Sequence, residues 1–228
     1  MCHPSCIEFV RANLARNEVE GKSVLEVGSL NVNGSVRAIV EGLGPCSYIG
    51  VDIQAGPGVD DICNANDIAS HFGERQFDLL ISTELLEHVR DWKKVISNFK
   101  NVLRPGGLLF ITTRSKGFGY HGFPFDYWRF ELSDMRDIFS DCVVELIVND
   151  PIVPGVFLKA RKPEVFLENN AEALSVFTII TGKREKNISS LNVFLFRGKQ
   201  RLSPIVLRVF PPRINATLRD LYRKLQKF

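Results

Sequence analysis

No run of 18 or more apolar residues occurs in the 228-residue sequence, so we expect no membrane-spanning helix. The first residues, Met1 to Cys6, lack the basic region and apolar core of a secretory signal. No internal repeat and no low-complexity tract is present, so we expect neither a repeat protein nor a disordered one. With 45% hydrophobic and 24% charged residues, the composition predicts a cytoplasmic globular protein, long enough for one sizeable domain plus an extension.

Cysteine is scarce, and the five that are present, at positions 2, 6, 46, 63 and 142, are odd in number and scattered. This argues against a disulfide framework and predicts reduced thiols. Cys2, His3 and Cys6 could bind zinc only with a fourth ligand from elsewhere in the chain. Because a complete Cys/His set is missing, we predict no metal site.

The net charge of +3 is unevenly distributed. Residues 197–228 carry nine Lys/Arg and one acid, which leaves 20 basic and 25 acidic residues, a net of −5, in the rest of the chain. We expect a basic amphipathic helix over 214–228, preceded by short strands at 174–181 and 191–196 and an irregular segment at 204–212. Such a helix fits peripheral contact with an anionic surface, such as the inner face of a membrane, and it equally fits packing on the acidic body.

Strand and helix patterns alternate along the first 160 residues. The apolar run 77–82 is bounded by polar residues, as expected for a central parallel strand. The strand patterns 143–148 and 155–160 follow one another with only a Pro-containing turn between them. The alternation predicts an α/β fold with a parallel sheet, and the last pair adds an antiparallel edge. The other expected strands cover 24–28, 48–53 and 108–112, and the expected helices cover 5–19, 36–43, 85–103 and 132–140.

The segment 24–34, VLEVGSLNVNG, is a short apolar strand that ends in glycine and leads through a tight polar turn into a helix start. Asp52 ends the next strand pattern, where a carboxylate can accept hydrogen bonds from ribose hydroxyls. The dinucleotide fingerprint G-x-G-x-x-G is absent, because Leu30 and Asn33 stand where the second and third glycines belong. Glu26 would repel a diphosphate in this turn. The turn therefore suits a cationic nucleoside without phosphate, and S-adenosylmethionine is the candidate.

Two further segments of the sequence follow this turn. The run 77–82 leads into ELLEHV at 84–89, and LRPGG at 103–107 precedes a strand. Together with the E-V-G-S turn and Asp52, these segments resemble the class I S-adenosylmethionine-dependent methyltransferases over residues 20–161. The resemblance implies a Rossmann-like, mostly parallel seven-stranded sheet with an antiparallel edge hairpin and helices on both faces. We therefore expect a methyltransferase domain over 1–162 and a C-terminal extension over 163–228.

The resemblance also implies a set of cofactor-binding residues. Gly28 and the backbone of Ser29 are expected beside the methionine part of the cofactor, and Glu26 near its amino group. Asn64 and Ala65 match the family's acidic and small residues at the adenine edge, although asparagine replaces the usual aspartate. The full expected set is Glu26, Gly28, Ser29, Asn31, Asp52, Ile53, Asn64, Ala65, Ser82 and Thr83.

Residues 113–130, which we call the acceptor loop, follow the strand expected over 108–112, at the edge where open α/β sheets bind ligands. Aromatic residues and glycines surround a few polar groups there, which is typical of a ligand pocket or lid. For an oxygen acceptor, His121, Asp126 or His88 could serve as the base. His88 could equally be a helix-start residue bonded to the backbone. We expect substrate contacts from Tyr120, Tyr127, Trp128 and Arg129, and the alternative is that Trp128 and Phe130 only fill the core.

The leading hypothesis is a methyltransferase that uses S-adenosylmethionine and acts on a small-molecule, sugar or glycan acceptor. The alternative is a catalytically silent protein of this fold that binds a membrane surface or a partner through its basic tail. The N/D-P-P-[YF] motif of base-amine enzymes is absent after the strand expected over 77–82, and the basic residues lie away from the expected site, so we expect no nucleic-acid partner. The missing glycines disfavour a nicotinamide oxidoreductase. The oligomeric state is left open.

Overall fold

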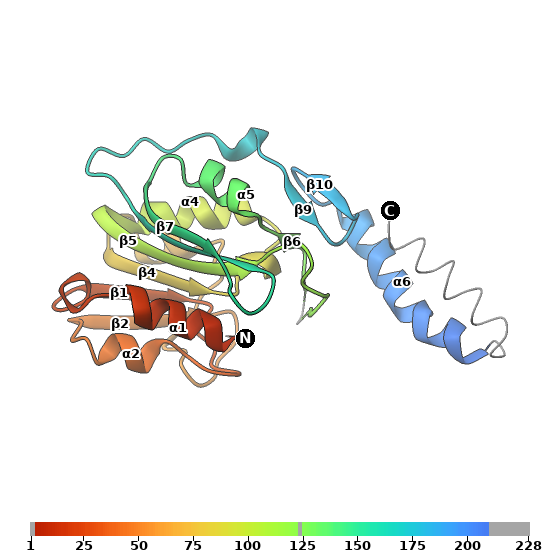
Figure 1. The fold of residues 1–228 in the computed structure, drawn as a ribbon, viewed down its shortest axis with the longest axis horizontal. Helices are drawn as coiled ribbons and strands as arrows, with labels where there is room; N and C mark the ends of the chain where they lie inside the picture. Colours follow the sequence, from red (N-terminus) through yellow and green to blue (C-terminus); the bar gives the residue numbers. More distant parts are fainter. Residues whose placement is uncertain (1–2, 123–124, 210–228) are drawn as a thin grey trace.

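The computed structural model describes residues 3–122 and 125–209. The strands of its main sheet are β1 (Ser23–Val27), β2 (Ser47–Asp52), β3 (Asp61–Ile62), β4 (Phe77–Thr83), β5 (Leu103–Arg114), β7 (Val143–Asn149) and β8 (Gly155–Arg161). They lie in the order β3-β2-β1-β4-β5-β8-β7 (Figure 1). Pairing is parallel from β3 through β5, whereas β8 is antiparallel to both β5 and β7. The predicted mostly parallel, seven-stranded sheet with an antiparallel edge hairpin is confirmed.

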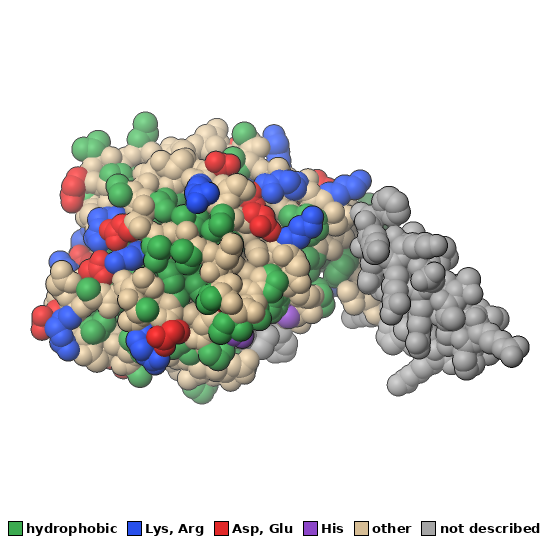
Figure 2. Space-filling model, viewed as in Figure 1, with side chains coloured by type: hydrophobic (Ala, Val, Ile, Leu, Met, Phe, Trp, Pro, Cys, Tyr) green, Lys and Arg blue, Asp and Glu red, His purple; other side chains and the backbone are tan. Residues whose placement is uncertain are grey.

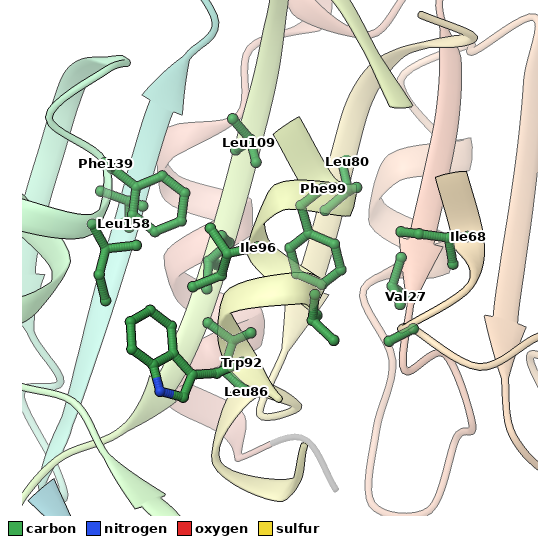
Figure 3. Packing of buried hydrophobic residues seen from close by; sticks show 14 of the residues in the cluster. Val27, Ile68, Leu80, Leu86, Trp92, Ile96, Phe99, Leu109, Phe139 and Leu158 are labelled. Atoms are coloured by element: carbon green, nitrogen blue, oxygen red, sulfur yellow. The ribbon is translucent and has the colours of Figure 1, made fainter. Parts of the chain in front are cut away.

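Helices cover both faces of this sheet, as predicted. They are α1 (Pro4–Asn13), α2 (Arg37–Glu41), α3 (Ile68–Phe72), α4 (Trp92–Val102) and α5 (Leu132–Ile138), with 3-10 turns η1 (Arg16–Glu18), η2 (Leu86–His88) and η3 (Ala171–Ala173). Successive residues of β4 face opposite ways: Leu79 packs with α1 and α2, and Leu80 packs with α3, α4 and α5. Figure 3 shows Ile96 and Phe99 of α4 directed at the sheet. Burial of such a side chain contributes roughly 1.5–3 kcal/mol.

The segment after β4 differs from the single helix expected over 85–103. The 3-10 turn η2 is followed by extended backbone at Val89, with φ −94° and ψ 131°, which is incompatible with a continuous helix. The helix α4 begins only at Trp92, where the Asp91 carboxylate accepts a hydrogen bond from the Lys94 amide at 3.2 Å and caps it. The break leaves a short, tightly turned segment at the carboxyl end of β4. The helix expected over 5–19 is likewise divided, into α1 and η1.

A second sheet joins the acceptor loop to the C-terminal extension. Its strands are β6 (Trp128–Arg129), β9 (Val176–Thr178) and β10 (Lys183–Glu185), in the order β10-β9-β6, and β9 realises part of the strand predicted at 174–181. The strand predicted at 191–196 is wrong, because these residues begin the helix α6 (Ser190–Val209). That helix also contains residues 204–209, which had been expected to be irregular. The helix expected over 214–228 lies outside the described residues.

The helix α6 points away from the main sheet (Figure 1). Leu191 and Phe194 on it are 63% and 71% exposed. Among the described residues, no helix combines the length and the apolar character needed to cross a membrane. On the face shown in Figure 2, Lys and Arg side chains are interspersed with Asp and Glu side chains.

Candidate functional site

A cavity of about 300 Å³ opens at the carboxyl ends of β1, β2 and β4. This is the edge of the sheet where ligands of open α/β folds bind. Its wall contains residues that the sequence assigned to the cofactor and residues assigned to the acceptor. From the first group come Gly28, Asp52, Ile53, Asn64 and Ala65, and from the second His88 and Tyr127.

The turn after β1 follows from its glycine. Gly28 has a φ of +83°, and a Cβ atom at this position would lie 3.3 Å from the Leu85 side chain. The amides of Gly28 and Ser29 both donate to the carbonyl of Val51, at 2.9 and 3.0 Å, so the turn is fastened to β2. The glycine therefore lets the turn pass close to Leu85, and the contact of Gly28 with a cofactor stays a prediction.

Asp52 is held in position by two backbone amides. Its Oδ2 accepts from Leu30 at 3.3 Å and its Oδ1 accepts from Gln54 at 3.2 Å. Each oxygen keeps a further lone pair for a ligand. Ile53, beside it, is 52% exposed and lines the cavity, which offers an apolar surface to a flat ring. Asn64 Oδ1 accepts from the Asn66 amide at 2.9 Å.

Glu26 is buried in β1 and has a partner inside the protein, which the sequence did not reveal. The Tyr48 hydroxyl donates to Glu26 Oε2 at 2.5 Å. Burial raises the pKa of Glu26 to about 7, although the Tyr48 hydrogen bond and the charge of Arg37 act in the opposite direction. Burial and the neighbouring Glu26 also raise the pKa of Tyr48.

Five residues predicted to contact the cofactor do not line this cavity in the described part of the chain: Glu26, Ser29, Asn31, Ser82 and Thr83. Ser82 Oγ donates to the Val27 carbonyl at 3.0 Å and ties β4 to β1. Asn31 Oδ1 accepts from the Gly34 amide at 3.0 Å and closes the polar turn. Their cofactor contacts stay predictions, and the contacts observed are those that shape the turn.

The acceptor loop is held by a buried ion pair. Arg129 donates to Asp126 from Nη1 to Oδ1 at 2.5 Å and from Nη2 to Oδ2 at 2.7 Å. Burial alone would raise the pKa of Asp126, but the hydrogen bonds from Arg129 and His121 outweigh it and hold this pKa well below its usual range. Arg129 also donates to the carbonyls of Phe118 and Gly119, at 3.1 and 2.9 Å.

Trp128 and Arg129 are completely buried and do not line the cavity, so the structure places them where they support the loop. The indole Nε1 of Trp128 donates to the carbonyl of Val89 at 3.0 Å, which fastens the loop to the segment after β4. Of the other two expected substrate contacts, Tyr127 lines the cavity and stacks on Phe125 with ring centroids 5.5 Å apart, whereas Tyr120 is nearly half exposed.

Two histidines from different segments meet beside the cavity. The rings of His88 and His121 lie 4.8 Å apart between centroids, at 66°. His88 Nδ1 lies 2.5 Å from the Phe125 carbonyl, and His121 Nδ1 lies 2.9 Å from Asp126 Oδ2. Of the three residues predicted to be catalytic, His88 and His121 thus come together, and Asp126 lies behind His121.

Sequence reasoning missed two contributors to this region. Glu87 is fully buried, and its Oε1 lies 3.8 Å from His121 Nε2. Its position directly before His88, after the fourth strand, was the signal available for it. The helix α6 also contributes, since Phe196 packs on Tyr120 and Arg197 lies over the Phe125 ring at 4.2 Å. No local pattern connects α6 with the acceptor loop.

The family model described as a methyltransferase domain matches residues 4–141. The chain belongs to the S-adenosylmethionine-dependent methyltransferases. This methyltransferase is 30% identical over 197 residues to the mitochondrial ubiquinone biosynthesis O-methyltransferase of Homo sapiens, a match that covers 76% of this chain and 49% of the human protein. It is 34% identical over 70 residues to the ubiquinone biosynthesis O-methyltransferase of Parvibaculum lavamentivorans, covering 31% of this chain and 27% of that protein.

The methyltransferase chain therefore spans about half or less of the length of these curated relatives. Among solved structures, it resembles the 1,6-didemethyltoxoflavin-N1-methyltransferase of Burkholderia thailandensis, with a TM-score of 0.55 and 16% identity. That similarity covers 69% of this chain and 78% of the other, and it concerns the fold.

Proposed function

We propose that this methyltransferase binds S-adenosylmethionine in the cavity and transfers its methyl group to a small-molecule acceptor. One observation carries the proposal: a single cavity wall joins Gly28 and Asp52, on the cofactor side, to His88 and Tyr127, on the acceptor side. When bound, the cofactor supplies an electrophilic methyl group on a sulfonium sulfur.

The residues present fit this cofactor. Gly28 lines the cavity, and Asp52 presents lone pairs suited to two ribose hydroxyls. The exposed face of Ile53 suits the adenine ring, and Asn64 and Ala65 lie in the same wall. No basic cradle for a diphosphate is needed for such a ligand.

On the acceptor side, the chain has to position a nucleophilic atom and remove a proton from it. The stacked rings of Phe125 and Tyr127 both line the cavity and offer a flat surface for a ring-shaped acceptor. His88, which also lines the cavity, and His121, whose ring lies against His88, are our candidates for handling the proton. Asp126, fixed by Arg129, is proposed to position His121 rather than to contact the acceptor.

We propose an acceptor with an aromatic or sugar ring, methylated on oxygen or nitrogen. Support for an oxygen acceptor comes from the relatives named as ubiquinone biosynthesis O-methyltransferases. A nitrogen acceptor is the alternative, and assays with amines distinguish the two. A sugar or glycan is the polar variant of the same proposal, because a sugar ring also packs on flat aromatic faces.

The proposal is tested in two steps. Calorimetric titration with S-adenosylmethionine and S-adenosylhomocysteine should show one site, and the absence of binding would favour the silent partner-binding alternative. A panel of phenols, catechols, amines and sugars is then assayed for S-adenosylhomocysteine release. We expect turnover with one ring-bearing class, and turnover confined to acyclic acceptors would contradict the aromatic platform.

A further inference from the structure

Three potential metal ligands converge beside the cavity: Glu87, His88 and His121. One carboxylate oxygen and one ring nitrogen from each histidine all lie within 4.8 Å of one another. Two of the side chains belong to η2 and the third to the acceptor loop, so the cluster exists only in the folded protein. It differs from an exposed acidic cluster, because Glu87 is fully buried and the histidines are partly buried.

The outer contacts of the histidines leave one nitrogen of each ring for a ligand. The Phe125 carbonyl can only accept, so His88 Nδ1, at 2.5 Å, carries the proton and Nε2 keeps its lone pair. Asp126 Oδ2 lies 2.9 Å from His121 Nδ1 without forming an aligned hydrogen bond, and its negative charge favours a proton on that nitrogen. A carboxylate or carbonyl behind a histidine is the usual support of a metal-binding imidazole.

Glu87 supplies a negative charge to the cluster, in which the two imidazole ligands are neutral. Its Oε2 accepts from the Thr113 hydroxyl at 2.9 Å. Its Oε1 is buried without a hydrogen-bond partner among the described residues, and it faces His121 Nε2 at 3.8 Å. A buried carboxylate oxygen without a donor loses its hydration with nothing to replace it, and a bound cation would offset that cost. Glu84, three residues earlier, is paired with Arg114 and is not available.

We propose that Glu87, His88 and His121 bind one divalent metal ion of the kind that imidazole suits, such as Zn²⁺, Mn²⁺ or Fe²⁺. Two histidines and one carboxylate are a recurrent ligand set for catalytic metal ions, and they leave a coordination position open. Ligand atoms around such an ion lie about 3–3.5 Å apart, so the three ligand atoms, which lie within 4.8 Å of one another, need to approach by roughly an ångström at the widest pair. The ion would lie between the acceptor loop and the cavity.

The catalytic part of this inference rests on the proposed function and specifies the acceptor as a molecule with a hydroxyl that can bind the metal ion. An acceptor oxygen could occupy the open position, where the ion lowers the pKa of the hydroxyl. The hydroxyl loses its proton to solvent, the oxygen forms a bond to the methyl carbon, and the carbon–sulfur bond breaks with its electron pair remaining on sulfur. A phenol or catechol with an adjacent oxygen suits such a site better than an isolated amine does.

The test measures metal binding without any acceptor. The full-length protein, freed of any histidine tag and stripped with a chelator, is dialysed against Zn²⁺, and bound zinc is counted by mass spectrometry. Co²⁺ is titrated in parallel, because its visible absorption reports nitrogen and oxygen ligands. We expect one ion per chain, with affinity reduced at least about 10-fold in Glu87→Gln and in His121→Gln.

His71→Gln is the matched control, because His71 is a partly exposed histidine paired with Asp61 at 2.7 Å, outside the cluster. It should bind the ion as the unchanged protein does. Calorimetry with S-adenosylmethionine checks that Glu87→Gln and His121→Gln remain folded. Both variants should bind the cofactor, since neither residue lines the cofactor cavity.

Absence of stoichiometric zinc and cobalt, or equal binding by Glu87→Gln and His121→Gln, would overturn the metal site. So would loss of the ion in His71→Gln. These results leave the proposed methyl transfer standing, with proton removal by the histidines. Failure to bind S-adenosylmethionine, with metal binding intact, would instead overturn the proposed function alone.

Discussion

Arg129 and Asp126 lie three residues apart and bind each other through both nitrogens and both oxygens, at 2.5 and 2.7 Å, with neither side chain accessible to solvent. Each member of the pair also forms hydrogen bonds to the backbone of the loop. Arg129 donates to the carbonyls of Phe118 and Gly119, and Asp126 accepts from the His121 amide at 3.0 Å. The acceptor loop is thus shaped around one ion pair, which sets the position of His121.

Breaking this pair should destabilise the protein strongly. Arg129→Met leaves the Asp126 carboxylate buried and unpaired, and we expect a loss of about 3–5 kcal/mol in the free energy of unfolding. Urea denaturation measures it. Adding Asp126→Asn to Arg129→Met should recover part of the loss, because the unpaired charge is removed. A cost below about 1 kcal/mol for Arg129→Met would show that the loop is held by other contacts.

Removing the carboxylate at the end of β2 should weaken cofactor binding. Asp52→Ala is expected to reduce the affinity for S-adenosylmethionine by about 1–3 kcal/mol, the scale of lost hydrogen bonds to a charged group. Calorimetry gives the affinities. Asp61→Ala is the control, since Asp61 pairs with His71 and does not line the cavity. Equal affinity in the Asp52 variant and the unchanged protein would remove Asp52 from the site.

The buried Glu26 should make stability depend on pH. Its pKa is about 7 in the folded protein, against an ordinary value of 4.5. Between these values the folded state holds more protons than the unfolded state, so Glu26 lowers the free energy of unfolding as pH rises from 4.5 to 7. From pH 5 to 7.5 the loss attributable to Glu26 is about 2 kcal/mol.

Urea titrations of the unchanged protein and of Glu26→Gln at both pH values isolate this contribution, because the variant keeps every other titrating group. Glu26→Gln should show the flatter profile. Glu8→Gln, at an exposed glutamate on α1, should follow the unchanged protein. Parallel profiles for the unchanged protein and Glu26→Gln would mean that Glu26 titrates in its ordinary range.

Replacing His121 should affect turnover rather than cofactor binding. With an acceptor from the panel in hand, His121→Ala should reduce turnover by about 10²–10⁴-fold, whether the ring removes the proton or holds an ion that activates the hydroxyl. The affinity for S-adenosylmethionine should change little, since His121 does not line the cavity. Undiminished turnover would leave His121 with a structural part only.

Local sequence patterns placed six of the seven strands of the main sheet, whereas the short strand β3 was not among the expected ones and only the family resemblance implied a seventh strand. Alternating strand and helix patterns and the hairpin at 143–160 identified the fold, because side-chain alternation and turn chemistry act over a few residues. The same reasoning failed at 191–196, since a short apolar run has no period that separates a strand from a helix. It also missed the break at Val89, where extended backbone separates η2 from the helix that Asp91 caps.

By itself, therefore, the sequence determined the mostly parallel sheet, the glycine turn after β1 and the aspartate at the end of β2, all of which are local features. Only the tertiary structure decided that Tyr48 is the partner of Glu26, and that Glu87, His88 and His121 meet. Those contacts join segments far apart in the chain. Their distances depend on how the loops pack over the sheet edge, and no spacing along the chain encodes that packing.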